Sequence, residues 1–355
     1  MVDAPGIPLS VLDLSPIPSG ASASSALRDT VEMARAAEAA GYRRFWLAEH
    51  HGIASVASSS PEVMIGAVAA ATRTRRVGSC GIMLPNHAPL KVAETFRALA
   101  GLYPGPDGRG RIDLGIGRAP GTDARTAIAL RRSREALTAD DFPDQYAELL
   151  GYVDGFEPEH PFAGITAIPD DVPLPPVWIL ASSYYGGQAA AHFGTGFAYA
   201  GHFGGADPAQ ATRIYRERFR PSTASGSQEP HVILAAAAIC SPDPDRARAL
   251  ADANALSMAR LRSGHPGPMP SPEEAAAHAW SSAERHIAES MRNKVSVGTP
   301  EEVAADLRRR VEEADADELM ITTSIHDVAE RRRSVELVAE VLGAGAGTER
   351  RLAQV

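Results

Sequence analysis

Cysteine is scarce in this chain of 355 residues, with only Cys80 and Cys240, far apart and without a C-x-x-C pair. A disulfide-stabilised scaffold and a zinc ribbon each need several cysteines at short spacing, so both classes are excluded. Scarce thiols without a disulfide framework are typical of a reducing compartment. We therefore expect a cytoplasmic protein.

Long apolar runs and an excess of positive charge are also missing. The longest strongly apolar run, Val232–Cys240, is about half of the roughly 20 residues that a membrane span needs. The first residues show no basic segment followed by an apolar one, so no signal peptide is expected. The formal net charge is −9, which argues against nucleic acid or an anionic membrane as a partner.

Apolar residues make up 44% of the chain, which is enough for a large core. Short apolar runs typical of buried parallel strands alternate with helical segments. Strands are expected at residues 9–14, 45–48, 76–83, 112–118, 177–181, 197–200, 231–240 and 318–323. No G-x-G-x-x-G motif follows the first of them. The count predicts a single α/β domain over residues 1–355, a (β/α)8 TIM barrel with insertions. A doubly wound sheet with an appended helical domain is the alternative.

The helical segments carry clear end signals. The helix at 27–40 is expected to be capped by Ser24 or Ser25 and ended by Gly41. Thr299-Pro300-Glu301-Glu302 forms a capping box with proline at the first helical position. Further helices are expected at 61–74, 89–102, 144–150, 209–219, 245–262 and 328–342. The segment at about 263–297 interrupts the alternation and is expected to be a mobile insertion or lid, and residues 343–355 a frayed tail.

The helix at 61–74 has almost no charged face. A helix that is apolar all round is buried on more than one side. In the outer ring of a barrel, the second side is most simply a subunit interface. We therefore expect a homodimer.

Polar residues gather where the predicted strands end. Glu49-His50-His51 follows the strand at 45–48, and the other strand ends supply Asp13, Asn86-His87, Arg118, Ser182-Ser183, His202 and Thr322-Thr323. The carboxyl ends of barrel strands form one face, where such folds place their chemistry. One interpretation is a metal-dependent hydrolase, although the first strand offers no His-x-His pair.

The other interpretation is a cofactor that carries a phosphate. Ser182 and Ser183 lie where a strand turns into a helix, so hydroxyls and free backbone N–H groups would form an anion site. Gly186-Gly187 would let the backbone approach closely. Arg118, at the end of the neighbouring strand, can add a charge-assisted hydrogen bond to the same group.

Four motifs together resemble those of the bacterial luciferase-like flavin-dependent monooxygenases. They are Ala48-Glu49-His50-His51, the segment 77–85 (VGSCGIMLP), Leu114-Gly115-Ile116-Gly117-Arg118 and the segment 297–302 (VGTPEE). The resemblance runs from about Leu9 to Leu342. It implies a (β/α)8 barrel that holds FMN at its carboxyl face, commonly as a dimer packed through its second and third helices.

The resemblance also implies roles for single residues. His50 matches the catalytic histidine beside the flavin ring, and Cys80-Gly81 matches a non-proline cis peptide against that ring. The phosphate and ribityl contacts match Arg118, Ser182 and Ser183. Glu49 and Tyr184 complete the implied cofactor-binding set. No metal ligand is implied.

The implied chemistry is that of an oxidoreductase of two-component type. Reduced FMN (FMNH2) from a separate flavin reductase reacts with O2 to a peroxyflavin, which oxygenates a small organic substrate. Residues 263–297 are the best lid candidate for keeping that site dry. The alternatives are an F420-dependent hydride-transfer enzyme of the same fold and a flavin-binding relative without catalysis. His50, with an ordinary pKa of about 6.5, could exchange a proton at neutral pH.

Overall fold

The structure is a computed structural model that describes residues 6–106, 108, 110–119, 121–131, 141–222 and 228–344. The predicted frayed tail at 343–355 lies outside these residues from 345 onward, and so do two positions of the glycine-rich loop at 104–110. No helix among the described residues is long and apolar enough to cross a membrane.

Eight parallel strands close into a barrel, which confirms the predicted fold. The ring runs β10-β1-β2-β3-β5-β6-β7-β8, and pairing of β8 with β10 closes it. The strands are β1 (Leu9–Asp13), β2 (Arg44–Leu47), β3 (Arg76–Ser79), β4 (Ile82–Met83), β5 (Ile112–Gly117), β6 (Val177–Ala181), β7 (Gly196–Ala200), β8 (Val232–Cys240), β9 (Val295–Gly298) and β10 (Glu318–Thr322). The short β4 continues the course of β3 along β5, and β9 pairs with β8 outside the ring.

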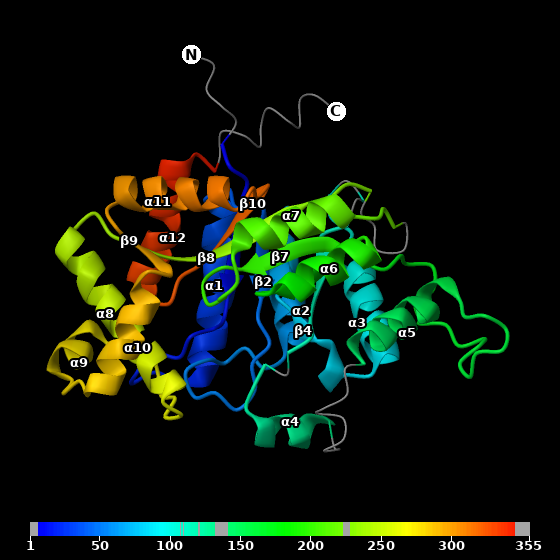
Figure 1. Ribbon diagram of the computed structural model, residues 1–355, viewed down its shortest axis with the longest axis horizontal. Coiled ribbons are helices and arrows are strands. Elements are labelled where there is room, and N and C mark those ends of the chain that lie inside the picture. Colours follow the sequence, from blue (N-terminus) through cyan, green and yellow to red (C-terminus); the bar gives the residue numbers. More distant parts are fainter. Residues whose placement is uncertain are drawn as a thin grey trace, which may run out of the picture.

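Helices surround the barrel (Figure 1). They are α1 (Ala23–Ala39), α2 (Pro61–Ala71), the 3-10 turn η1 (Leu84–Asn86), α3 (Pro89–Leu102), α4 (Ala124–Arg131), α5 (Phe142–Asp154), α6 (Tyr184–Phe193), α7 (Pro208–Arg218), α8 (Pro244–Arg262), α9 (Pro272–Ala277), α10 (Ser282–Arg292), α11 (Pro300–Glu313) and α12 (Val328–Leu342). In this view α8, α9 and α10 lie together on one side of the molecule and α3 and α5 on the other. The group of α8, α9 and α10 and the pair of α3 and α5 thus flank the barrel on opposite sides.

Side chains alternate along each strand between the inside of the barrel and the helices outside it. On β2, Phe45 and Leu47 belong to the large core shared with the helices. Trp46, and Ala48 just beyond the strand, belong to the small cluster inside the barrel. This cluster consists of Leu12, Trp46, Ala48, Trp178, Ala198, Ile233, Ala235 and Met320. The period of two residues therefore sets which strand-end residues face the barrel axis.

A buried ion cluster fills the amino-terminal end of the barrel. The guanidinium of Arg44 donates to Asp113 Oδ2 at 2.8 Å and to Glu318 Oε1 at 2.9 Å. Asp113 also accepts from Trp46 Nε1 at 3.0 Å and from Arg76 at 2.6 Å. Arg44, Asp113 and Glu318 are almost inaccessible to solvent. This end of the barrel is thus packed with paired charges, and the opposite end is left for a ligand.

Several element boundaries differ from the predicted ones, and three of them are informative. The expected strand at 76–83 is divided into β3 and β4, and the peptide bond between Cys80 and Gly81, which lie between them, is cis. Ser22, and neither Ser24 nor Ser25, caps α1, because its side chain accepts from the Ser25 amide. The helix α2 ends at Ala71, since the next residue, Thr72, adopts an extended backbone. The box at Thr299 is confirmed as the start of α11.

The insertion at 263–297 folds into α9, α10 and β9 beside α8. Each of the two helices begins with a capping box, at Ser271 and at Ser281. Met269 is buried, and its backbone pairs with the segment after β1: its amide donates to Ile17 O at 2.7 Å, and its carbonyl accepts from Ser19 N at 2.8 Å. The segment before α9 is thus attached to the barrel, and its role as a lid stays a prediction.

Candidate active site

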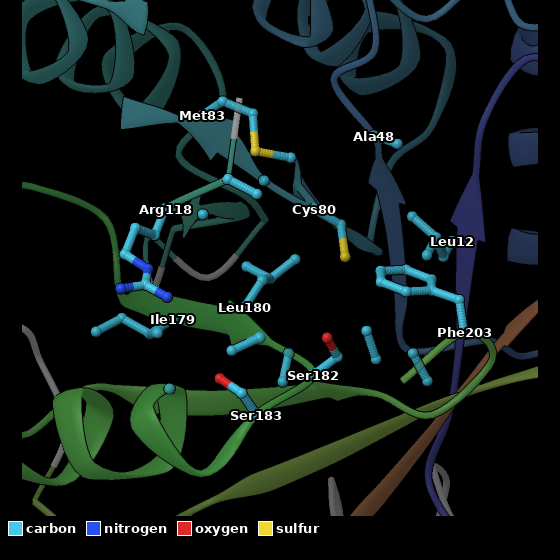
Figure 2. Close-up of a pocket in the computed structure, with 18 of the residues that line it drawn as sticks. Leu12, Ala48, Cys80, Met83, Arg118, Ile179, Leu180, Ser182, Ser183 and Phe203 are labelled. Atoms are coloured by element: carbon cyan, nitrogen blue, oxygen red, sulfur yellow. The ribbon is translucent and has the colours of Figure 1, made fainter. Parts of the chain in front are cut away.

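A large cavity opens at the carboxyl ends of the barrel strands (Figure 2). It encloses about 1070 Å³ of space, open solvent at its mouth included. Most lining residues are apolar, among them Leu12, Leu14, Met83, Phe142, Ile179 and Leu180. The polar lining is concentrated in His50, Arg118, Ser182, Ser183 and His202. The cavity thus combines apolar walls with a few polar groups, the composition typical of a small-molecule site.

One end of the cavity is built for an anion. Ser183 caps α6, yet its hydroxyl forms no hydrogen bond with the helix amides, so both hydroxyl and amides can face a ligand. The guanidinium carbon of Arg118 lies 4.3 Å from the centre of the Tyr185 ring, which holds the cation over the first turn of α6. Figure 2 shows Arg118 and Ser183 on the same side of the cavity. Hydroxyls, amides and a guanidinium are the donors that a phosphate monoester prefers.

His50 places its imidazole in the cavity, and one nitrogen of the ring forms a hydrogen bond with a backbone carbonyl. Its Nδ1 lies 3.2 Å from the carbonyl oxygen of Gly121. A carbonyl only accepts, so Nδ1 carries the proton and Nε2 is left as an acceptor. Burial lowers the pKa of His50, and the Gly121 carbonyl and Glu49 oppose that shift only in part. The ring is therefore neutral at pH 7, which corrects the expectation of an ordinary histidine pKa.

Glu49 lies behind the cavity wall and is not among the residues that line the cavity. Its buried carboxylate accepts from His51 Nε2 at 2.8 Å, from His87 Nε2 at 2.9 Å and from the Met83 amide at 2.9 Å. Burial alone would raise the pKa of Glu49, but these hydrogen bonds lower it on balance. Glu49 also raises the pKa of His87 against the opposing effect of burial. Glu49 thus fixes the loops that carry His50 and the cis peptide.

The predicted cis peptide between Cys80 and Gly81 is present, and both residues line the cavity. A side chain at position 81 would meet the backbone of β5, because a Cβ there would lie 2.9 Å from Gly115 O. Burial raises the pKa of the Cys80 thiol well above its usual value. The thiol is therefore protonated and serves as an apolar wall of the cavity.

Most predicted site residues meet in this one cavity, namely His50, Cys80, Gly81, Arg118, Ser182 and Ser183. Tyr184 does not line it; its neighbour Tyr185 does, and the Tyr184 hydroxyl accepts from the Asp207 amide at 3.4 Å. His202 lines the cavity too and was absent from the predicted cofactor and catalytic set. Strand alternation would have found it, because Ala198, Ala200 and His202 follow one another inward at steps of two.

The arrangement fits a phosphate-bearing cofactor. No group of three or more His, Cys, Asp or Glu side chains able to hold a metal ion occurs in the described part of the chain. The cavity instead combines an anion site, apolar walls and an imidazole acceptor. Fold and site together define a (β/α)8 barrel with donors suited to an anionic group at its mouth.

The chain belongs to the luciferase-like monooxygenase family, whose sequence model matches residues 7–318. A curated luciferase-like monooxygenase of Escherichia coli (strain K12) is 40% identical over 335 residues, which cover 94% of this chain and 97% of the relative. The crystal structure of apo-MsnO8 superposes with a TM-score of 0.82 at 32% identity and covers 95% of this chain and 99% of its own.

More distant structures share the fold. The oxygenating constituent of 3,6-diketocamphane monooxygenase from Pseudomonas putida, solved with FMN, has a TM-score of 0.68 at 18% identity and covers 94% of this chain and 97% of its own. An F420-dependent secondary alcohol dehydrogenase, solved with an F420–acetone adduct, has a TM-score of 0.64 at 17% identity, covering 96% and 99%. The same fold thus hosts both cofactors, and the chain is an oxidoreductase by family.

Proposed function

We propose that this protein is an FMN-dependent monooxygenase. It would bind reduced FMN delivered by a separate flavin reductase and use O2 to oxygenate a small organic substrate. The observation that carries the proposal is the pairing, in one cavity, of the anion site at Ser183 and Arg118 with the imidazole of His50. Bound reduced FMN would supply the electrons that activate O2.

Each part of the cavity has a separate task in this proposal. Arg118, Ser182 and Ser183 hold the phosphate end, and the cis peptide at Cys80-Gly81 supplies a flat apolar wall for the ring. His50 Nε2 accepts or returns a proton at the reacting end, because its Nδ1 proton is committed to Gly121. The apolar lining excludes water, which would otherwise divert reducing equivalents.

The runner-up is hydride transfer with F420, which the fold also accommodates. Family membership favours oxygenation, since the matched family and the Escherichia coli relative are both described as monooxygenases. The two cofactors are separated by an anaerobic titration of the purified protein with reduced FMN and, in parallel, with F420. We expect reduced FMN to bind more tightly than F420 and than oxidised FMN.

The anion site is tested by Arg118→Ala, which removes one charge-assisted contact. The affinity for reduced FMN should fall ten- to hundredfold, corresponding to about 1.5–3 kcal/mol. Arg125→Ala is the matched control, because Arg125 is also exposed but does not line the cavity. An unchanged affinity in Arg118→Ala would place the phosphate elsewhere, and tight binding of F420 alone would refute the FMN proposal.

A further inference from the structure

His202 is a second imidazole in the cavity, and the proposed function leaves it without a task. Its imidazole is one of the groups that line the cavity. Nδ1 is sealed from solvent and unpartnered, so Nε2 is the nitrogen that the cavity can reach. Burial lowers the pKa of His202 to about 4, although the Ala235 carbonyl partly opposes that shift. The ring is neutral at pH 7 and holds one unused acceptor.

His202 and His50 face each other across the barrel. His50 follows β2 and His202 follows β7, and these two strands are four positions apart in a ring of eight. Both rings line the same cavity, and a positive charge on His50 would lower the pKa of His202. A small molecule between them therefore has one imidazole on either side.

The loop that carries His202 is anchored. The ammonium of Lys294 donates to the carbonyl of Phe203 at 3.1 Å and to that of Gly204 at 2.9 Å. The His202 and Phe203 rings pack edge to face with centres 4.6 Å apart. Figure 2 shows Phe203 across the cavity from Arg118, beside Leu12 and Ala48. The imidazole thus sits in the apolar half of the cavity, away from the anion site.

We propose that His202 positions the substrate by accepting, at Nε2, a hydrogen bond from an O–H or N–H group. Nδ1 is the buried ring nitrogen, so a neutral ring that carries its proton there presents Nε2 to the cavity as an acceptor. The cavity lining contains no carboxylate among the described residues, so a cationic substrate finds no partner there. The substrate class is an uncharged molecule with an apolar body and one hydrogen-bond donor. This inference rests on the proposed function, since it takes the other half of the cavity to hold the cofactor.

The test uses two probes, N-butylacetamide and its N-methyl derivative, in which a methyl group replaces the N–H donor. Their affinities for the protein, with and without FMN, are measured by ligand-observed NMR. The wild type should prefer N-butylacetamide by about three- to tenfold, the value of one neutral hydrogen bond. His202→Leu should abolish the preference. His202→Gln, which keeps an acceptor, should retain it. The reduced-FMN affinity should stay within a few-fold in both variants.

The outcomes separate the two proposals. A preference that persists in His202→Leu, or an absence of any preference in the wild type, overturns the role of His202 and leaves the flavin function standing. Failure of both amides to bind at millimolar concentration overturns it as well. If reduced FMN fails to bind while the preference still follows His202, the flavin function is wrong and the donor site remains.

Discussion

At the residue scale, the proton on His50 Nδ1 determines what this side chain can do. The Gly121 carbonyl holds that proton, so only Nε2 is left to take one from a reacting group. Burial lowers the pKa of His50, and a lowered histidine pKa keeps the ring in its basic form at pH values where a free histidine is protonated. His50 is therefore ready as a base throughout the neutral range.

The pH profile of turnover follows from this shift. We expect the acid limb of kcat to lie below pH ~6.5, the ordinary pKa of histidine, because activity is lost only when His50 takes up its second proton. His50→Ala should slow turnover by about 10²–10⁴ and remove that limb, with the reduced-FMN affinity kept within a few-fold. Product and hydrogen peroxide yields measured together should show more peroxide per flavin oxidised. Normal turnover of His50→Ala with saturating flavin would disprove the role.

The alternation of side chains along a strand, continued past the strand's last residue, predicts several of the residues that line the cavity. The step of two residues along β2 puts Ala48 and His50 inside and turns Glu49 outward, so Glu49 supports the wall instead of forming it. The same step identifies His202 after β7. No such rule separates Tyr184 from Tyr185, because both open a helix whose rotation depends on packing. Contacts between loops, such as that of His50 with Gly121, depend on loop paths that the local sequence does not encode.

At the element scale, α2 has an apolar face turned to solvent. Val63, Ala67 and Ala70 lie at steps of four and three and are exposed, and Val63 is 67% accessible. Leu102, at the end of α3, is 71% accessible. Exposed apolar side chains on adjacent helices are typical of an interface. The largely uncharged helix α2 thus has an apolar face that no other part of the described chain covers. We propose that a second copy of the chain covers it in a homodimer.

A charge on this face should break the proposed dimer. We expect Ala67→Glu to shift sedimentation from dimer to monomer at micromolar concentration, because association would bury an unpaired carboxylate. Ala305→Glu is the control, since Ala305 is an exposed alanine on α11. A wild-type protein that already sediments as a monomer, or an Ala67→Glu protein that stays dimeric, would refute the interface.

Elements with strong end signals were predicted almost to the residue. Thr299 starts α11 with a capping box, and α12 ends before Gly343, whose φ of 75° is left-handed. The strand β9 was missed, because it is only four residues long and pairs only with the last residues of β8. The cap at Ser22 was missed for another reason: three serines near this start offer similar caps, and the chain path after Pro18 decides between them.

At the scale of the whole molecule, the ion cluster joins strands that are distant in sequence. Arg44 ties β2 to β5 through Asp113 and to β10 through Glu318. Burial would raise the pKa of Glu318 and of Asp113, but the neighbouring arginines lower both. A lowered carboxylate pKa contributes stability above its unfolded value of about 4, and that stability is lost as the pH falls through the folded pKa.

Removing the shared cation should destabilise the barrel. Arg44→Met leaves two buried carboxylates without their central partner, which should cost about 3–5 kcal/mol in the free energy of unfolding at pH 7. The deficit should shrink in acid, since protonated carboxylates need no cation. Urea denaturation of both proteins across the pH range measures it. Arg35→Met, on an exposed part of α1, should change stability by no more than about 0.5 kcal/mol. A loss below ~1 kcal/mol for Arg44→Met would contradict the prediction.

The same cluster determines how molecules move through the enzyme. Side chains fill one end of the barrel, so the cavity is closed at that end. Among the described residues, its mouth is then the opening through which molecules enter and leave. Cofactor and substrate would therefore enter and leave through the same opening. Release of product and exchange of spent cofactor would then compete for one route to solvent.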